Sequence, residues 1–372
     1  MTSFTELGLS EPLCRALAGA SYTSPTPIQS KAIPHLIAGR DVLGVAQTGT
    51  GKTAVFVLSL LQQMRQAGGG GAGPRALVLA PTRELAVQIG AEFGRFGPAH
   101  GLRHAVVIGG VGLRPQIRAI ATAPDILIGT PGRLLDLLQQ RKLPLQHVRH
   151  LVLDEADRML DLGFLPQVRR ILAALPAKRQ SMLFSATMPK DIVVLANKVL
   201  QSHVRVDAAP NAPVTIDRIE QRLIRVASGA KRALLEALLE DPDLSRVLVF
   251  TRTKHGANRL CKQLGREGFS ALAIHGNKTQ GARQKALESF RNGSSRVLVA
   301  TDIAARGIDV TGVSHVINFD LPQEPESYVH RIGRTARAGA AGIAISFCDP
   351  GEVKLLRGIQ ALTRTKLPEA AA

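Results

Sequence analysis

The chain has 372 residues, 45% of them hydrophobic, which is too long for one ordinary hydrophobic core and predicts two globular domains. The net charge of +18 favours a polyanionic partner, nucleic acid before a membrane surface. Aromatic residues make up 3% and Trp is absent, so contact through a sugar–phosphate backbone is favoured over base stacking. On charge alone, the alternative is a basic soluble enzyme without such a partner.

The first residues, MTSFTELGLSEPL, lack a basic region followed by an apolar one, so no signal peptide is predicted. No uninterrupted apolar run reaches the roughly 18 residues that a membrane span needs. Cys14, Cys261 and Cys348 lie far apart and fit neither a disulfide framework nor a zinc site. We therefore expect a cytoplasmic protein with no membrane partner.

Short runs rich in Val, Ile and Leu, each followed by a polar or Gly-containing turn, predict strands along the whole chain. They lie at 41–46, 75–81, 104–110, 125–131, 150–157, 181–187, 246–253, 270–276, 295–302, 314–320 and 342–349. Helix-like segments lie between them, including 84–96, 133–141, 230–240, 255–267 and 279–291. The runs lack alternation, as expected for strands of a parallel sheet buried on both faces. Strand–helix alternation repeated twice predicts two α/β domains.

The stretch DAAPNAPVTID (207–217) contains prolines and small residues but no apolar run, which is typical of a linker. We therefore predict a first domain at 1–207, a linker at 208–217 and a second domain at 218–372. The basic excess is shared by the two halves, so a polyanion can contact both. After about residue 350 we expect no basic tail and no accessory domain.

The stretch AQTGTGKT (46–53) follows a predicted strand and precedes a helical run, which is the context of a phosphate-binding loop. Its glycines allow the backbone to curl so that N–H groups face phosphates, and the helix start adds partial positive charge. Lys52 is predicted to reach the β- and γ-phosphates, and Thr53 to hold Mg²⁺. The usual pattern opens with Gly where Ala46 stands, and the alternative is a Gly-rich turn without a ligand. The predicted nucleotide-binding residues of this loop are Ala46, Gln47, Thr48, Gly49, Thr50, Gly51, Lys52 and Thr53.

In LVLDEADRML (151–160), an apolar run is followed by the three carboxylates Asp154, Glu155 and Asp157. Like charges this close repel unless something offsets them. In phosphate-loop enzymes a carboxylate at the end of another strand holds the metal ion, so Asp154 is the predicted Mg²⁺ ligand. Glu155 is the predicted general base that orients and deprotonates the attacking water. A divalent cation would offset much of the charge; the alternative is a solvated acidic loop.

An ordered series of such stretches resembles the DEAD-box ATP-dependent RNA helicases of superfamily 2, whose name is spelled by residues 154–157. The matching stretches are SPTPIQ (24–29), AQTGTGKT (46–53), PTREL (81–85), GG (109–110), TPGR (130–133), DEAD (154–157), SAT (185–187), ATDIAARGIDV (300–310) and HRIGRTARAG (330–339). The series spans nearly the whole chain, and the core without tails is most similar to bacterial members of the RhlE type. The resemblance implies two tandem RecA-like domains, each a mostly parallel sheet flanked by helices.

The resemblance implies further contacts to ATP in the first domain. Gln29 would read the adenine edge, for which a side-chain amide offers one donor and one acceptor. Phe4 would stack on the ring, although on its own it indicates a core residue. The family commonly has Gly-aromatic where Ser21 and Tyr22 stand, so a part for Tyr22 in adenine packing stays open.

In the second domain, Arg331, Arg334 and Arg337 are spaced three residues apart, which would line them along one face of a helix. Arginine supplied across an interface can stabilise charge on a transferring phosphoryl group. By resemblance Arg334 and Arg337 are the arginine fingers, and the alternative is a solvated basic helix. The family commonly has Gly where Ala336 stands, and we expect the methyl group to be a small change.

The resemblance also implies residues that couple the ATP and RNA sites. Ser185 and Thr187 would hydrogen-bond the DEAD segment and link hydrolysis to strand separation, although alone they indicate a strand-end turn. His330 would couple to the other motifs. Asp309 would approach the nucleotide ribose once the domains close.

The RNA contacts implied by the resemblance sit just beyond the predicted strand ends, where ligands bind in open α/β sheets. Hydroxyl, guanidinium and backbone N–H groups suit phosphate oxygens, so weak sequence specificity is expected. The residues are Arg83, Gly110, Thr130 and Arg133 in the first domain and Arg283, Thr301 and Arg306 in the second.

The sequence thus predicts an ATP-dependent RNA helicase that uses ATP and Mg²⁺. Closure of its two domains on ATP and single-stranded RNA would open duplexes locally or remodel RNA–protein complexes. Ribosomal and RNA-decay complexes are candidate partners. Two alternatives stay open: a DNA-directed motor with the same core, and an RNA clamp that binds ATP without turnover.

Overall fold

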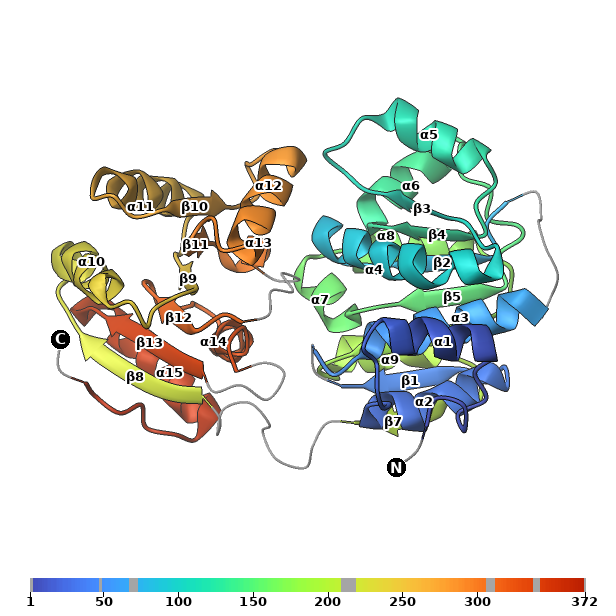
Figure 1. Cartoon of the computed structure of the whole chain (residues 1–372), viewed down its shortest axis with the longest axis horizontal. Coiled ribbons are helices and arrows are strands. Elements are labelled where there is room, and N and C mark those ends of the chain that lie inside the picture. Colours follow the sequence, from blue (N-terminus) through green and yellow to red (C-terminus); the bar gives the residue numbers. More distant parts are fainter. Residues whose placement is uncertain are drawn as a thin grey trace. The chain divides into compact units, whose positions relative to one another are not determined.

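The computed structural model describes residues 3–46, 49–66, 73–208, 219–305, 312–336 and 342–370. The chain divides into two compact units, unit 1 at Met1–Ala209 and unit 2 at Pro210–Ala372 (Figure 1). This division falls inside the predicted linker 208–217, of which only residue 208 belongs to the described residues. No helix in the described ranges combines the length and apolar character needed to cross a membrane.

Within its described residues, unit 1 is built on a seven-stranded sheet whose strands all run parallel. The strands are β1 (Val42–Val45), β2 (Ala76–Leu79), β3 (His104–Val107), β4 (Ile126–Gly129), β5 (His150–Leu153), β6 (Gln180–Ser185) and β7 (Val204–Asp207). Their spatial order is β3-β4-β2-β5-β6-β1-β7. The carboxyl end of β6 therefore lies between the ends of β5 and β1, where two of the predicted motifs begin.

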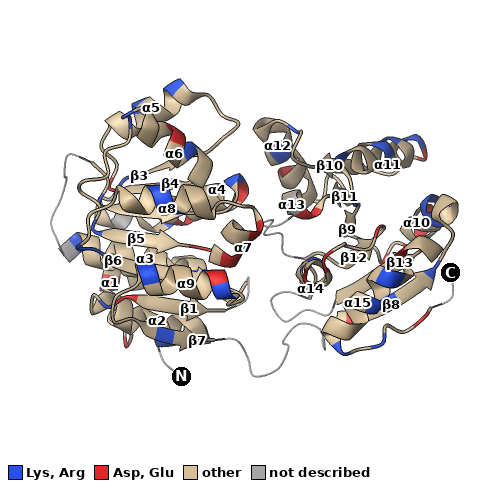
Figure 2. Ribbon diagram, turned by 180° about the vertical axis from the view of Figure 1, so that it is seen from behind, with Lys and Arg blue, Asp and Glu red and all other residues tan. Residues whose placement is uncertain are grey.

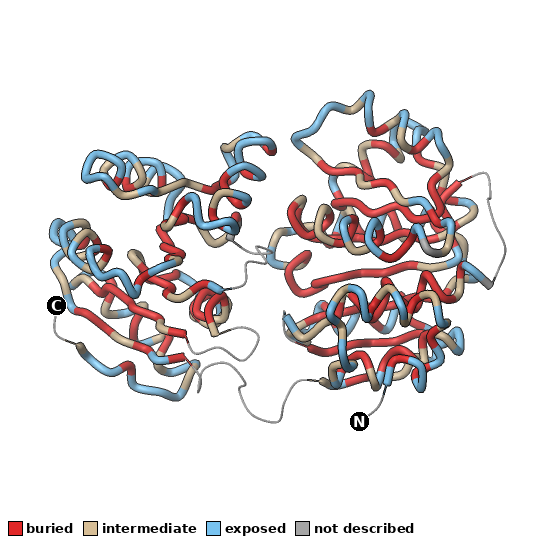
Figure 3. Tube along the Cα trace, viewed as in Figure 1, coloured by how far each residue is buried: buried red, intermediate tan, exposed pale blue. Residues whose placement is uncertain are grey.

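Helices cover both faces of this sheet, because successive strand residues point to opposite faces and both sets are apolar. One face packs on α1 (Glu11–Gly19), α2 (Pro27–Ile37), α3 (Lys52–Gln66) and α4 (Arg83–Phe96). The other packs on α5 (Leu113–Ala121), α6 (Pro131–Gln139), α7 (Ala156–Asp161), α8 (Leu165–Ala173) and α9 (Lys190–Val199). Figure 3 shows the strands of this sheet buried and the outer turns of the helices exposed.

Unit 2 repeats this architecture with a six-stranded parallel sheet in the order β10-β11-β9-β12-β13-β8. Its strands are β8 (Ile219–Arg225), β9 (Val247–Phe250), β10 (Ala271–Ile274), β11 (Val297–Ala300), β12 (His315–Asn318) and β13 (Gly342–Cys348). The helices α10 (Lys231–Glu240) and α11 (Lys254–Arg266) cover one face. The other face packs on α12 (Gln280–Arg291), α13 (Asp302–Ala305), α14 (Pro325–Ile332) and α15 (Val353–Thr363).

All eleven strands and five helices predicted from the sequence have counterparts, and the two-domain α/β prediction is confirmed. The strands β7 and β8 were not predicted from the sequence, and each is an edge strand that pairs with one neighbouring strand. Their residues alternate between exposed and covered positions, so neither segment forms a continuous apolar run.

A buried ion network connects the start of α10 to the segments that follow β12 and β13. The Nζ atom of Lys231, whose side chain is 2% exposed, lies 2.6 Å from Glu352, 3.2 Å from Asp349 and 3.8 Å from Asp320. Arg252 reaches the second carboxylate oxygen of Glu352 at 2.6 Å. Because an isolated buried charge is very costly, these partners depend on one another.

We predict that Lys231→Met lowers the stability of unit 2 by about 3–5 kcal/mol, since it leaves the buried Glu352 carboxylate with only the exposed Arg252 as a cation among its described ion pairs. Native-state hydrogen exchange of the β12 and β13 amides measures this loss. The exposed Lys262 on α11 gives the matched control Lys262→Met, which should change stability by less than about 0.5 kcal/mol. Equal protection in the two variants would contradict the role of the network.

Candidate active site

The predicted phosphate loop joins β1 to the amino terminus of α3, which begins at Lys52. Gly49 and Gly51 have φ angles of +87° and +91°, a left-handed conformation that favours glycine. The Lys52 side chain is 6% exposed, and its Nζ donates a hydrogen bond to the Ala46 carbonyl at 2.5 Å. The Lys52 ammonium group therefore lies next to the first residue of the predicted phosphate loop.

The Gln29 side chain fastens α2 to this loop. Its Nε2 donates to the Gly51 carbonyl at 3.2 Å, and its Oε1 accepts from the Thr26 N–H at 2.9 Å. A Cβ at position 51 would lie 2.5 Å from Nε2, so a side chain there would displace Gln29. Adenine recognition by Gln29 stays a prediction, and support of the loop is a contact that the sequence analysis did not foresee.

Asp154 follows β5 and is 2% exposed. The pKa of Asp154 is raised to about 7, mainly by burial and also by the nearby Glu155 and Asp157 carboxylates. The Lys52 ammonium and the hydrogen bond that Asp154 accepts from the Glu155 N–H, at 2.9 Å, act in the opposite direction. Figure 2 shows the acidic positions at the start of α7, next to the end of β5. The Lys52 ammonium alone therefore does not bring the pKa of Asp154 back to its ordinary value.

A divalent cation beside Asp154 would favour the charged form of this carboxylate. No group of three or more His, Cys, Asp or Glu side chains that could hold a metal ion occurs in the described ranges. Magnesium bound with a nucleotide needs only one or two carboxylates, because phosphate oxygens and water complete its shell. Asp154 and Thr53, in the first turn of α3, suit such a site.

Asp157 connects the DEAD turn to the end of β6. Its Oδ2 accepts hydrogen bonds from the Ala186 N–H at 3.1 Å, the Thr187 N–H at 2.8 Å and the Thr187 hydroxyl at 3.0 Å. The Asp157 N–H donates to the Ser185 hydroxyl at 3.2 Å. The Ala46 N–H donates to the Ser185 carbonyl at 3.0 Å. The contact predicted between Ser185, Thr187 and the DEAD segment is therefore present, and it continues to the phosphate loop.

Glu155, the predicted general base, forms an ion pair that the sequence analysis missed. Its Oε2 lies 2.9 Å from Nη1 of Arg158, and the two side chains are 9% and 8% exposed. The spacing of three residues was the available signal, because such pairs are neighbours on a helix.

The structure gathers the RNA-contact residues predicted for unit 1 at the carboxyl ends of β2, β3 and β4. Arg83 lies against the turn after β3, where a Cβ at Gly110 would be 2.2 Å from its Nη1. Both terminal nitrogens of Arg133 donate to the Val111 carbonyl, at 3.2 and 3.3 Å. Thr130 immediately precedes α6 and is 7% exposed.

The prediction that the three arginines of unit 2 share one helical face is wrong, because α14 ends at Ile332 and only Arg331 lies in it. Arg331 is 2% exposed, pairs with Asp302 at 2.5 and 2.8 Å, and lies 4.9 Å from the Phe250 ring centroid. These contacts make Arg331 a structural residue of unit 2.

Arg334 lies in the turn after α14, and its Nε donates to the carbonyl of His330 at 3.3 Å. Ala336 has a φ angle of +53°. The methyl group there is therefore not the small change expected from the sequence, because a side chain in this conformation costs roughly 1–2 kcal/mol. A similar strain exists at Ser21, whose φ is +62°.

The remaining predicted residues lie as follows. Arg283 is a buried residue of α12, and Thr301 directly follows β11. Phe4 is 7% exposed and belongs to the core of unit 1, so its stacking on adenine stays a prediction. Tyr22 packs edge-on against Phe96, with ring centroids 6.0 Å apart. Gln47, Thr48, Arg306, Asp309 and Arg337 lie outside the described residues.

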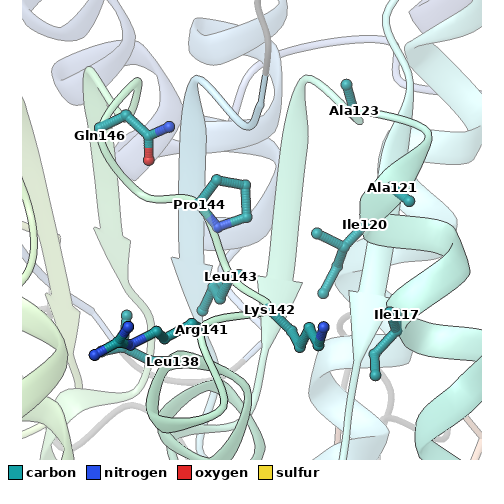
Figure 4. A pocket seen from close by; sticks show the side chains of 10 residues that line it. All are labelled: Ile117, Ile120, Ala121, Ala123, Leu138, Arg141, Lys142, Leu143, Pro144 and Gln146. Carbon is teal, nitrogen blue, oxygen red and sulfur yellow. The ribbon is translucent and has the colours of Figure 1, made fainter.

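A surface groove of about 620 Å³ lies elsewhere on unit 1, at the carboxyl ends of α5 and α6 (Figure 4). Its walls include Ile117 and Ile120 of α5 and Arg141 and Lys142 after α6. The predicted RNA contacts lie at the amino ends of the same helices, so this groove is separate from them.

Known proteins resemble this chain over almost its whole length. The DEAD/DEAH box helicase family matches residues 26–194, and the helicase conserved C-terminal domain matches residues 230–339. The DEAD-box ATP-dependent RNA helicase CshA of Bacillus cereus is 44% identical over 369 residues, which cover 99% of this chain and 69% of that protein. CshA of Geobacillus kaustophilus is 42% identical over 367 residues, covering 99% and 78%. The chain belongs to the DEAD-box family of ATP-dependent RNA helicases.

Solved structures of this family share the fold. Saccharomyces cerevisiae Dbp5 bound to RNA and ADP BeF3 has a TM-score of 0.87 and 32% identity, covering 100% of this chain and 96% of that chain. Mss116p bound to single-stranded RNA and AMP-PNP has a TM-score of 0.88 and 28% identity, covering 99% and 78%. Both units are therefore RecA-like domains, as the sequence predicted. The similarity to the RhlE type stays a prediction.

We predict that Asp157→Asn disrupts the link between the DEAD turn and β6. An amide group must turn its NH₂ toward either the Arg158 N–H or the donors at Ala186 and Thr187, so at least one donor loses its acceptor. The free energy of unfolding should fall by about 1–3 kcal/mol. Hydrogen exchange at the amides of residues 186 and 187 should accelerate.

The exposed Asp243, in the turn after α10, gives the control Asp243→Asn, which should change stability by less than about 0.5 kcal/mol. Unchanged exchange at residues 186 and 187 in Asp157→Asn would show that the link does not depend on this carboxylate.

Proposed function

We propose that the chain binds ATP with Mg²⁺ and single-stranded RNA, and that ATP turnover drives local opening of RNA duplexes or remodelling of RNA–protein complexes. The observation that supports this function best is the division of tasks among three adjacent carboxylates. Asp157 accepts hydrogen bonds from the end of β6 and Glu155 is paired with Arg158, whereas Asp154 is a buried carboxyl whose charged form needs more positive charge than Lys52 supplies. Each group therefore suits a different step of phosphoryl transfer.

In the proposed reaction, Lys52 leaves the Ala46 carbonyl and binds the β- and γ-phosphates of ATP. Asp154 and Thr53 would hold Mg²⁺, which would supply positive charge near the phosphate oxygens. Glu155 orients the attacking water and accepts its proton. Gln29 and Phe4 bind adenine.

Arginine residues of unit 2 complete the proposed site. Arg334 and Arg337 stabilise the charge on the transferring phosphoryl group, and Asp309 contacts the ribose. Since Arg331 is committed to Asp302, it is not one of these fingers. His330, Ser185 and Thr187 couple the two ligands. We infer that ATP and RNA together bring the units into the active arrangement, so that each ligand favours binding of the other.

The proposed RNA track consists mainly of groups that suit phosphates: Arg83, Gly110, Thr130, Arg133, Arg283, Thr301 and Arg306. Such contacts carry little base information, so weak sequence specificity is expected. The net charge of +18 supports this preference for a polyanion. We further propose that the protein works in the cytoplasm, with ribosomal or RNA-decay complexes as candidate partners.

The function is tested by the steady-state ATPase rate without polymer, with single-stranded RNA and with single-stranded DNA. We expect stimulation by RNA that exceeds stimulation by DNA and weakens as salt rises, because phosphate contacts release counterions. Equal stimulation by DNA would favour the DNA-directed alternative. Polymer binding without any ATP turnover would favour the clamp.

Arg334 gives a separate test of the proposed finger. We predict that Arg334→Ala lowers the RNA-stimulated turnover number by roughly 10³-fold or more. The exposed Arg266 on α11 gives the control Arg266→Ala, which should keep wild-type turnover. A loss smaller than tenfold in a folded Arg334→Ala protein would assign this residue a structural role.

A further inference from the structure

The proposed general base, Glu155, forms a buried ion pair with Arg158. The Arg158 guanidinium lies 2.9 Å from Oε2 of Glu155, and both side chains are more than nine-tenths buried. An arginine in this setting keeps its charge and presents a planar, fixed set of donors. The Glu155 carboxylate is therefore held at one oxygen by a rigid partner within the same unit.

The backbone of the turn is shaped so that this pair forms. Glu155 has φ 50° and ψ 55°, a left-handed conformation that a non-glycine residue seldom adopts. It immediately precedes α7, and the Arg158 N–H donates to the Glu155 carbonyl at 3.0 Å. The hydrogen bonds that Asp157 accepts from the N–H groups of residues 186 and 187 fix the part of the turn that follows Glu155. Strain of this kind persists only where the surroundings fix it, and it clusters at functional sites.

The proposed role of Glu155 makes a demand on its orientation that Asp154 and Asp157 do not share. Asp157 is satisfied by backbone N–H groups and a hydroxyl, and Asp154 interacts with the Lys52 ammonium. Glu155 must instead keep one carboxylate oxygen in a fixed place relative to a water molecule. Rotation of an unrestrained glutamate side chain would move that oxygen, and a shift of about 1 Å can cost roughly 100-fold in rate.

We propose that Arg158 is a positioning residue that holds the Glu155 carboxylate in the orientation needed to activate the attacking water. This inference rests on the proposed function of the site. Arg158 acts through Glu155 and does not itself contact ATP. Its removal should therefore affect the rate of the chemical step and leave the binding of both ligands in place.

The test compares Arg158→Met, which keeps the length of the side chain without its charge, with Arg158→Lys, which keeps the charge without the planar donors. We expect Arg158→Met to lower the RNA-stimulated kcat roughly 10- to 100-fold. The KM for ATP and the Kd for RNA should stay within about twofold of wild type, and Arg158→Lys should give an intermediate kcat.

Combination with Glu155→Gln separates positioning from a general loss of structure. If Arg158 acts through Glu155, adding Arg158→Met to Glu155→Gln should cause no further fall in kcat, because the residue that it positions is already inactive. Multiplicative losses in the double variant, or a wild-type kcat in Arg158→Met, would overturn the proposal. The exposed Arg170 on α8 gives the matched control Arg170→Met, which should match wild type.

Thermal unfolding of every variant identifies any that fails to fold. If Arg158→Met does not fold, Arg158→Lys and Arg158→Gln replace it, and a wild-type kcat in both would equally reject the role. Measurement of the wild-type protein distinguishes the proposed function from the positioning role of Arg158. No RNA-stimulated hydrolysis by wild type would refute the proposed function, whereas an active wild type with an equally active Arg158→Met refutes only the positioning role.

Discussion

Three carboxylates at the end of one buried strand set the central constraint of this structure, because buried negative charges need partners of their own. Asp157 uses the N–H groups at the end of β6, Glu155 uses Arg158, and Asp154 has Lys52 together with the proposed magnesium ion. The strand order β5-β6-β1 makes this arrangement possible, because β6 lies between the DEAD turn and the phosphate loop. Ser185 bonds to both segments: its hydroxyl accepts from the Asp157 N–H, and its carbonyl accepts from the Ala46 N–H.

The same constraint separates the roles of cations in unit 2. Lys231 and Arg331 are almost fully buried, and each is held by carboxylates of its own unit. A cation committed in this way cannot be withdrawn without leaving those carboxylates unpaired. Arg334 lies in the turn after α14 rather than in the helix, and its Nε donates to the His330 carbonyl at 3.3 Å. Position relative to α14 therefore distinguishes Arg331 from Arg334, although the sequence spacing treats them alike.

The central strands were predictable because strands buried on both faces form continuous apolar runs. The edge strands β3 and β10 were also predictable because they are mainly apolar, whereas β7 and β8 were not, since both carry charged residues at exposed positions. Lys52, Asp154 and Glu155 were predictable as site residues because their chemistry is tied to local motifs. The Gln29 contact with Gly51 and the network around Lys231 join residues far apart in sequence, which spacing does not reveal. The end of α14 was misjudged because arginine spacing alone does not indicate where a helix stops.

The most direct measurement is a crystal structure of the chain with Mg²⁺ and a nonhydrolysable ATP analogue. The account predicts that the metal ion lies with Asp154 and Thr53, that Glu155 stays within hydrogen-bond distance of Arg158, and that Asp157 keeps its bonds to residues 186 and 187. A metal ion held by Glu155 or Asp157, or a Glu155 carboxylate separated from Arg158, would contradict the division of tasks among the three carboxylates.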